Sequence, residues 1–198
     1  MKRVSKSLYS LKEIYKITYE SFLTVRKITF ARKEKLMSKL LMQRIMLAVT
    51  EVNDCPACSY SHSKISLEAG MSNDEIKNML AGEHSDVPQD EITAIMFAQH
   101  YADTRGKPSE EAWRQVVEVY GQETAEGILG AVRMIMMGNA YGIAYGSLIK
   151  RFKGNPDQRS SLAYELAVVL ASATFIPIAL AHSLLANFVN TSLISFEK

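Results

Sequence analysis

The sequence predicts an all-α fold, because apolar residues recur at helical spacing along most of the 198-residue chain. The segments with this spacing are separated by turn and breaker signals, among them Gly106-Lys107-Pro108 and Gly154-Asn155-Pro156. No segment between turn signals alternates apolar and polar residues as a half-buried strand does, and no glycine-rich phosphate loop is present. We therefore expect a bundle of helices.

Amphipathic patterns indicate the first two helices. Residues 8–31 carry apolar side chains at roughly helical spacing among basic ones. Residues 34–52 are expected to form a second helix with a wide buried face. That face consists of Leu36, Leu40, Leu41, Ile45, Leu47, Ala48 and Val49.

The stretch Asn53-Asp54-Cys55-Pro56 predicts the end of one helix and the start of the next. Asp54 or Cys55 occupies the capping position, and Pro56 falls in the first turn, where its missing N–H is not needed. The helix that starts here is expected to run to residue 69, with Gly70 as a left-handed terminator.

The later helices follow from capping and breaker signals. Ser72-Asn73-Asp74-Glu75 is a capping box that opens a short helix over 72–80. Helical spacing continues over 91–104, Ser109 caps a helix that reaches residue 120, and residues 123–152 form a long apolar helix. A terminal helical segment follows residue 156.

Composition places the chain among ordinary globular domains. With 47% hydrophobic and 22% charged residues, it can build a core, and its length suits one domain. The net charge of +2 gives no general argument for nucleic acid or acidic substrates. Two cysteines exclude a disulfide-stapled miniature fold and a four-cysteine zinc or iron–sulfur site within one chain.

Three regions are expected within one domain: a basic amphipathic helix over 1–32, a helical core over 33–156 and apolar helices over 157–198. Residues 1–44 hold 12 Lys and Arg against 3 Glu. Such a segment can bind nucleic acid or an anionic membrane, but the interleaved apolar residues favour docking on acidic parts of this chain or of a neighbouring subunit. Lys12, Glu13, Lys16 and Glu20 break any apolar leader, so we expect a cytoplasmic protein.

The C-terminal segment 166–196 contains no Asp, Glu, Lys or Arg. Its length is sufficient for a membrane span, but polar residues interrupt it and Pro177 is expected to kink or split the helix. We favour packing in the core or in a homo-oligomer interface over membrane association.

Four glycines of the long apolar helix, Gly130, Gly138, Gly142 and Gly146, share one helical face. Each costs about 0.5–1 kcal/mol relative to alanine in a helix interior, which indicates close approach of another element. Tight helix packing is the favoured explanation. A role for Arg133 or Asn139 beside a ligand is the alternative.

Reactive side chains concentrate at Cys55, Cys58 and His62, which share one face of a helix start. The free N–H groups and positive dipole end of a helix start stabilise a thiolate, and two sulfurs at this spacing can close a disulfide within one turn. His62 can accept the proton of Cys58, and peroxide would oxidise a thiolate to a sulfenic acid that the second cysteine converts into a disulfide.

The cysteine pair has two other interpretations. Zinc could be bound by Cys55, Cys58, His62 and one of His84, His100 or His182, but no second closely spaced ligand pair is present, so we predict no metal and no other cofactor. Two buried, inert cysteines are the structural alternative, which the nearby histidine and helix-start context disfavour.

At these residues the sequence resembles the alkylhydroperoxidase D branch of the carboxymuconolactone decarboxylase family. The family pattern is a Glu, eleven residues and then Cys-x-x-Cys-x-x-x-His, matched here by Cys55, Cys58 and His62. The similarity covers about residues 33–102. It implies an all-helical antioxidant fold, a trimer or hexamer, and peroxidase or disulfide-reductase activity with electrons from a thiol partner protein. Lactone decarboxylation is not expected.

Carried over by position, the resemblance makes Cys58 the peroxide-reacting sulfur, Cys55 the resolving sulfur and His62 part of a proton relay. The dipole argument alone favours Cys55 as the more acidic thiol. The relay glutamate is replaced by Gln43, which can form hydrogen bonds but cannot take a proton. Glu51, four residues before Cys55, is a candidate substitute. Ala57 stands where well-known members have a histidine.

Overall fold

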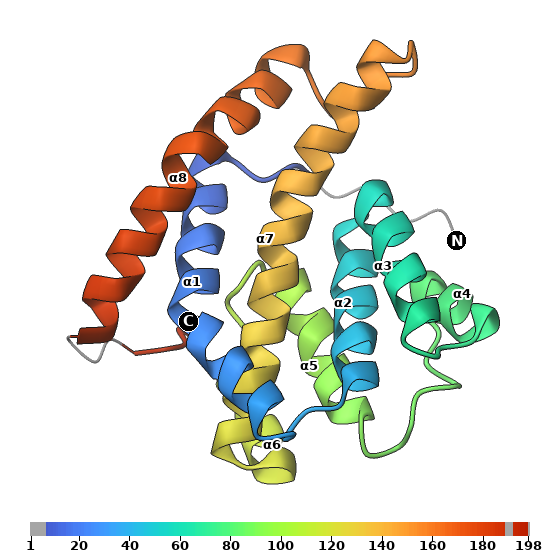
Figure 1. Ribbon diagram of the computed structural model, residues 1–198, viewed down its shortest axis with the longest axis vertical. Helices are drawn as coiled ribbons and strands as arrows, with labels where there is room; N and C mark the ends of the chain where they lie inside the picture. The colour runs from blue at the N-terminus through green and yellow to red at the C-terminus, as the bar shows by residue number, and fades with distance from the viewer. Residues whose placement is uncertain (1–6, 189–191, 198) are drawn as a thin grey trace.

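The computed structural model describes residues 7–188 and 192–197, and over these residues the chain is all-helical, as predicted, with no β-strand. The connections between consecutive helices are loops (Figure 1). The eight helices are α1 (Leu11–Lys33), α2 (Lys39–Asn53), α3 (Pro56–Glu68), α4 (Asn73–Ala81), α5 (Ile92–Asp103), α6 (Glu110–Tyr120), α7 (Gln122–Phe152) and α8 (Leu162–Phe188).

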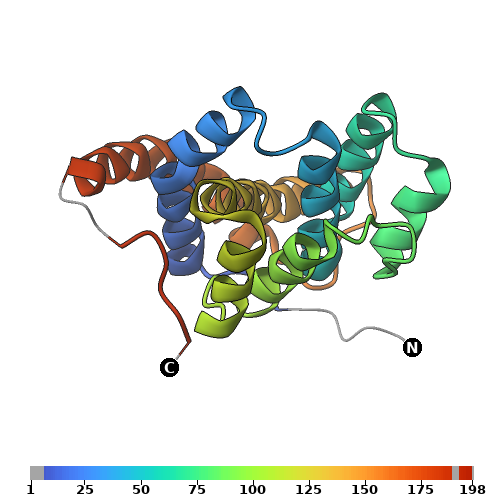
Figure 2. The ribbon, with the colours of Figure 1, turned by 90° about the horizontal axis from the view of Figure 1, so that it is seen from below.

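Helix α7 is the central element of the bundle. It packs against α1 and α8 on one side and against α2 and α3 on the other. Viewed from below, α7 lies between α1 and α2, with α8 outside α1 and with α3 and α4 at the opposite edge (Figure 2). Helices α5 and α6 complete the core beside α2 and the N-terminal half of α7. This arrangement buries most of α7 and holds the start of α3 against its C-terminal half.

Side-chain caps set the ends of most helices. Ser38, Ser72 and Ser109 each accept a backbone N–H of the first turn, and Gly82 ends α4 in the left-handed region. Helix α1 begins at Leu11 rather than near residue 8, because Ser10 and Glu13 form a reciprocal capping box.

The start of α2 differs from the prediction. Ser38 caps the helix, so residues 34–38 form a loop in which Lys35 has a left-handed φ of 56°. Leu36, expected on the buried face, therefore lies in this loop and is 37% exposed. The remaining apolar face of α2 is largely buried as predicted, with Leu41, Ile45 and Leu47 in the core and Leu40 partly buried against it.

The basic first helix docks on the rest of this chain, in agreement with the favoured prediction. Its residues Ile14, Ile17 and Ile28 are buried against the core. Lys27 pairs with Glu126 of α7, with 2.7 Å between Nζ and Oε2.

The predicted C-terminal helices are one continuous helix, α8, with Pro177 inside it, so of the expected kink or split the split is not found. Contacts with α1 and α7 hold this helix together across the proline, which removes one backbone hydrogen bond. Much of α8 is exposed rather than buried: Leu170 is 72%, Leu185 67% and Phe188 86% exposed.

Two of the described helices, α7 and α8, are long and apolar enough to cross a membrane by length and composition. Of the apolar window in α7, 78% is buried inside the protein, as in a core helix, against 22% for α8. This test alone is weak evidence for a membrane span, because core helices of soluble proteins also pass it.

Candidate redox site

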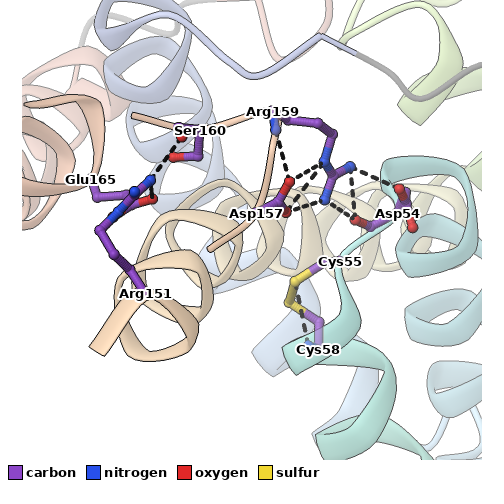
Figure 3. Close-up of polar contacts among 8 residues, drawn as sticks. All are labelled: Asp54, Cys55, Cys58, Arg151, Asp157, Arg159, Ser160 and Glu165. Carbon is purple, nitrogen blue, oxygen red and sulfur yellow. Dashed lines mark hydrogen bonds and ion pairs between the residues drawn. A yellow bond between two sulfur atoms is a disulfide. The ribbon is translucent and has the colours of Figure 1, made fainter. Parts of the chain in front are cut away.

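Cys55 and Cys58 form a disulfide at the start of α3, with their Cα atoms 5.3 Å apart (Figure 3). Asp54 ends α2 in the left-handed conformation, with φ of 51°, and this turns the chain so that α3 can start at once. Cys55 is the N-cap of α3 and Pro56 its first residue. The predicted closure of two sulfurs within one helical turn is therefore present.

The two sulfurs have different surroundings. The Cys55 Sγ accepts a hydrogen bond from the Cys58 backbone N–H, with 3.3 Å between the heavy atoms. Cys55 is 0% exposed and Cys58 is 8% exposed, and they form a small buried cluster with Ile143 of α7, against which Leu8 packs. In the reduced protein, the first-turn N–H groups would favour a thiolate at Cys55, whereas Cys58 is the residue with the larger exposed fraction.

Helix α7 passes close behind the disulfide because it has glycines there. A Cβ atom added at Gly142 would lie 2.6 Å from the Cys58 Sγ and 3.2 Å from the Cys55 Sγ, and one at Gly146 would lie 3.2 Å from the Ala57 Cβ. Gly130 is equally close to α1, 3.0 Å from the Ile28 Cβ. The predicted close approach holds at these three positions, whereas Gly138 has room for a methyl group.

Arg159, in the loop between α7 and α8, ties this loop to the start of the cysteine helix. Its Nη1 lies 2.7 Å from the Asp54 Oδ2 and its Nη2 2.9 Å from the Asp157 Oδ2 (Figure 3). The hydrogen bonds from Arg159 hold the pKa of Asp157 below its ordinary value. A second ion pair lies nearby, where the buried Glu165 at the start of α8 pairs with Arg151 of α7.

The residues before α1 reach the cluster that contains the disulfide, because Leu8 packs against it. Arg105 holds them in place: its Nη2 donates to the Ser7 carbonyl oxygen at 2.6 Å and its Nη1 pairs with Glu13 at 2.7 Å. Tyr164 of α8 donates a hydrogen bond to the Tyr9 carbonyl oxygen. Leu8 is thereby kept against the two cysteines.

His62 lies on α3, one turn beyond Cys58, and is partly buried. Burial lowers the pKa of its imidazole, so the ring stays neutral at pH 7. Its Nδ1 is buried and has no hydrogen-bond partner among the described residues. The structure therefore supplies no carboxylate at this nitrogen, as a glutamate relay through it would need.

The two candidate relay residues of α2, Gln43 and Glu51, are both buried. Glu51 accepts a hydrogen bond from the Gln99 Nε2 through its Oε2, at 3.4 Å, and the Gln99 Oε1 lies 2.9 Å from the His84 Nε2. This polar chain joins α2, α5 and the loop after α4. The Gln43 Oε1 has no hydrogen-bond partner among the described residues.

The other polar candidates, Arg133 and Asn139, form hydrogen bonds inside the bundle. The buried Arg133 donates from Nε to the Tyr101 hydroxyl at 2.7 Å, and the buried Asn139 accepts from the Thr50 hydroxyl at 3.2 Å. Among residues 7–188 and 192–197, no group of three or more His, Cys, Asp or Glu side chains is placed to hold a metal ion. The three other histidines form hydrogen bonds elsewhere: His84 with Gln99, His100 with Ser109 and His182 with Tyr15.

Comparisons with protein-family models, with curated proteins and with solved structures found no match to this chain. The site is therefore interpreted from its own geometry. A dithiol at a helix N-terminus, with one cysteine fully buried and the other slightly exposed, is suited to exchange with an external thiol or peroxide.

Proposed function

We propose that this protein is a cytoplasmic thiol-dependent peroxidase or disulfide oxidoreductase of the alkylhydroperoxidase D type. One observation carries the proposal: the Cys55–Cys58 disulfide sits at the N-terminus of α3, where Cys55 Sγ accepts a first-turn N–H. This hydrogen bond favours Cys55 as the leaving thiolate when the disulfide is attacked. The slight exposure of Cys58 favours this sulfur as the point of attack.

In the proposed cycle, the Cys58 thiolate attacks the outer oxygen of a hydroperoxide, the O–O bond breaks, and the alkoxide takes a proton and leaves as an alcohol. Cys58 is now a sulfenic acid. The Cys55 thiolate attacks its sulfur, a proton is taken up, water leaves and the disulfide forms. Two thiols from a donor protein then reduce it, the first by attacking Cys58 Sγ and expelling the Cys55 thiolate. A disulfide substrate would be reduced by the reverse exchange.

We propose that His62 accepts the proton of the Cys58 thiol, because its neutral imidazole lies one turn further along the same helix. Gln43 at the expected glutamate position argues for a slower relay, since an amide cannot carry a proton. Glu51 is retained as a candidate proton carrier, with Gln99 and His84 as its hydrogen-bonded neighbours.

We also propose that copies of the chain assemble as a homo-oligomer, a trimer or hexamer by the family resemblance. The exposed apolar residues of α8, among them Leu170, Leu185 and Phe188, support an interface on this helix. The same surface supports the second candidate function, a non-catalytic helical oligomer in which the dithiol senses redox state or only packs.

The peroxidase proposal predicts that fully reduced protein loses both thiols after one equivalent of an alkyl hydroperoxide. The expected product is the Cys55–Cys58 disulfide with one equivalent of alcohol. Thiol titration in denaturant and intact mass, which falls by two hydrogens, measure the first, and chromatography the second. Free thiols after prolonged incubation would contradict the peroxidase proposal. If the reduced protein does not react with peroxide but exchanges rapidly with a small-molecule disulfide, the disulfide-reductase version of the proposal is supported instead.

The His62 assignment predicts an acid limb in the rate of this reaction. Burial lowers the pKa of His62 below the ordinary histidine value of about 6.5. The imidazole therefore stays neutral, and the rate stays on its plateau, down to a pH below this value. The rate then falls as pH drops through the lowered pKa. His62→Gln should remove this limb and slow the reaction at pH 7 by about 100-fold. Stopped-flow mixing with peroxide measures both, and His182→Gln, a matched control at an exposed histidine of α8, should retain the limb. An unchanged profile in His62→Gln would refute the assignment.

A further inference from the structure

A cleft of about 510 Å³ lies beside the disulfide, between the first turns of α3, the C-terminal part of α7 and the loop before α8. Ala57 and Gly142, which contact the disulfide region, form part of its floor. The cysteines themselves are not among its lining residues, so the cleft is a separate space that shares a wall with the redox site. Its volume is within the range of about 300–1,000 Å³ that is typical of small-molecule sites.

The walls of the cleft are largely apolar. Tyr60 of α3 and Ile149 of α7 face it and are 78% and 54% exposed, and Ile143 lies deeper. Large apolar side chains that remain exposed around a cavity are typical of a ligand surface. These walls are suited to hold an alkyl or aromatic body.

The rim of the cleft carries an excess of positive charge. Lys150, Lys153, Arg159 and Asp157 lie along it, but Arg159 is paired with Asp157 and Asp54. Lys150 and Lys153 are exposed, and no ion pair among the described residues involves either ammonium group. Cations are favoured near the C-terminus of a helix, which accounts for lysine in the last turn of α7. It does not account for two lysines among the residues that line an otherwise largely apolar cleft.

We propose that this cleft binds a small amphipathic anion, with its apolar body between Tyr60 and Ile149 and its carboxylate between Lys150 and Lys153. The apolar part supplies most of the affinity by burial, and the two lysines select a charged end over a neutral one. The proposal depends on the cleft and not on sulfur chemistry, so it stands or falls independently of the redox function.

Isothermal titration of the oxidised full-length chain with octanoate tests this assignment. Octanamide, which has the same length and no charge, is the matched ligand. We expect saturable binding of octanoate with one ligand per chain and an affinity for octanamide about tenfold lower. Lys150→Gln/Lys153→Gln should reduce octanoate affinity to that of octanamide. Lys64→Gln/Lys77→Gln, which removes two exposed lysines of α3 and α4, should leave it unchanged.

The apolar wall has its own test. Tyr60→Ala should weaken octanoate and octanamide by the same factor, about fivefold, because it removes a side chain that contacts only the body of the ligand. Failure of octanoate to bind, equal binding of octanamide, or equal effects of the two lysine pairs would each overturn the proposal. Binding that neither the lysine pair nor Tyr60→Ala reduces would place the ligand elsewhere, for example on the exposed side of α8, and would also overturn it.

Discussion

Gly142→Ala is expected to destabilise the oxidised protein by about 2 kcal/mol, although alanine is the better helix former. The added methyl carbon would lie 2.6 Å from the Cys58 Sγ and 3.2 Å from the Cys55 Sγ. The disulfide fixes both sulfurs at the start of α3, so neither can swing away as a long side chain would. Helix α7 and the start of α3 must separate instead, and this disturbs the packing of Ile143 against the cysteines.

Urea unfolding of the oxidised protein measures this loss. Reduction of the disulfide should relieve part of it in Gly142→Ala, since a free Cys58 side chain can change rotamer. Gly138→Ala is the matched control, one turn earlier on the same helix, where the nearest atom to an added Cβ is the Ile135 Cδ1 at 3.8 Å. It should be neutral or stabilise by up to about 1 kcal/mol. Equal effects at the two positions would show that the close approach is not what requires glycine.

Much of the fold follows from local signals in the sequence. The caps Ser72 and Ser109 act on N–H groups two or three residues away, and Pro56 and Gly82 act on their own backbone conformation. Such interactions do not depend on the rest of the chain. Helix α8 is different: Pro177 favours a break locally, but contacts with α1 and α7 hold the helix together, and the sequence around residue 177 does not encode these contacts.

The candidate site divides in the same way. Cys55, Cys58 and His62 lie within eight residues, so helical spacing places them on one face. Arg159 is 105 residues from its partner Asp54, and no spacing rule connects them. The cover formed by Leu8 likewise depends on Arg105, which lies 98 residues from Ser7. For Gly142 the sequence indicated a close approach without saying which element approaches.

The largest effect on reactivity is expected from the unequal burial of the two cysteine residues. Cys55 is the more acidic thiol by its hydrogen bond from the Cys58 N–H, and Cys58 is the more accessible one. An aromatic disulfide reagent must approach a sulfur along the line of the bond that forms. For the fully buried Cys55, this requires displacement of Leu8 and its neighbours, a local opening whose free energy exceeds the gain from a lower pKa. Access is therefore expected to outweigh acidity.

Two single variants separate these effects: Cys55→Ser leaves Cys58 as the free thiol, and Cys58→Ser leaves Cys55. The first should react with the aromatic disulfide about 10- to 100-fold faster than the second at pH 7, since an opening that costs about 1.4–2.8 kcal/mol slows attack by this factor. Both thiols should react at the same rate in guanidinium chloride, and equal thermal melting of the variants excludes a folding defect. Leu8→Ala added to Cys58→Ser should recover part of the rate, because it thins the cover over Cys55. Faster reaction of Cys55 in the folded protein would reverse the assigned roles, with helix-start acidity rather than exposure selecting the sulfur that is attacked.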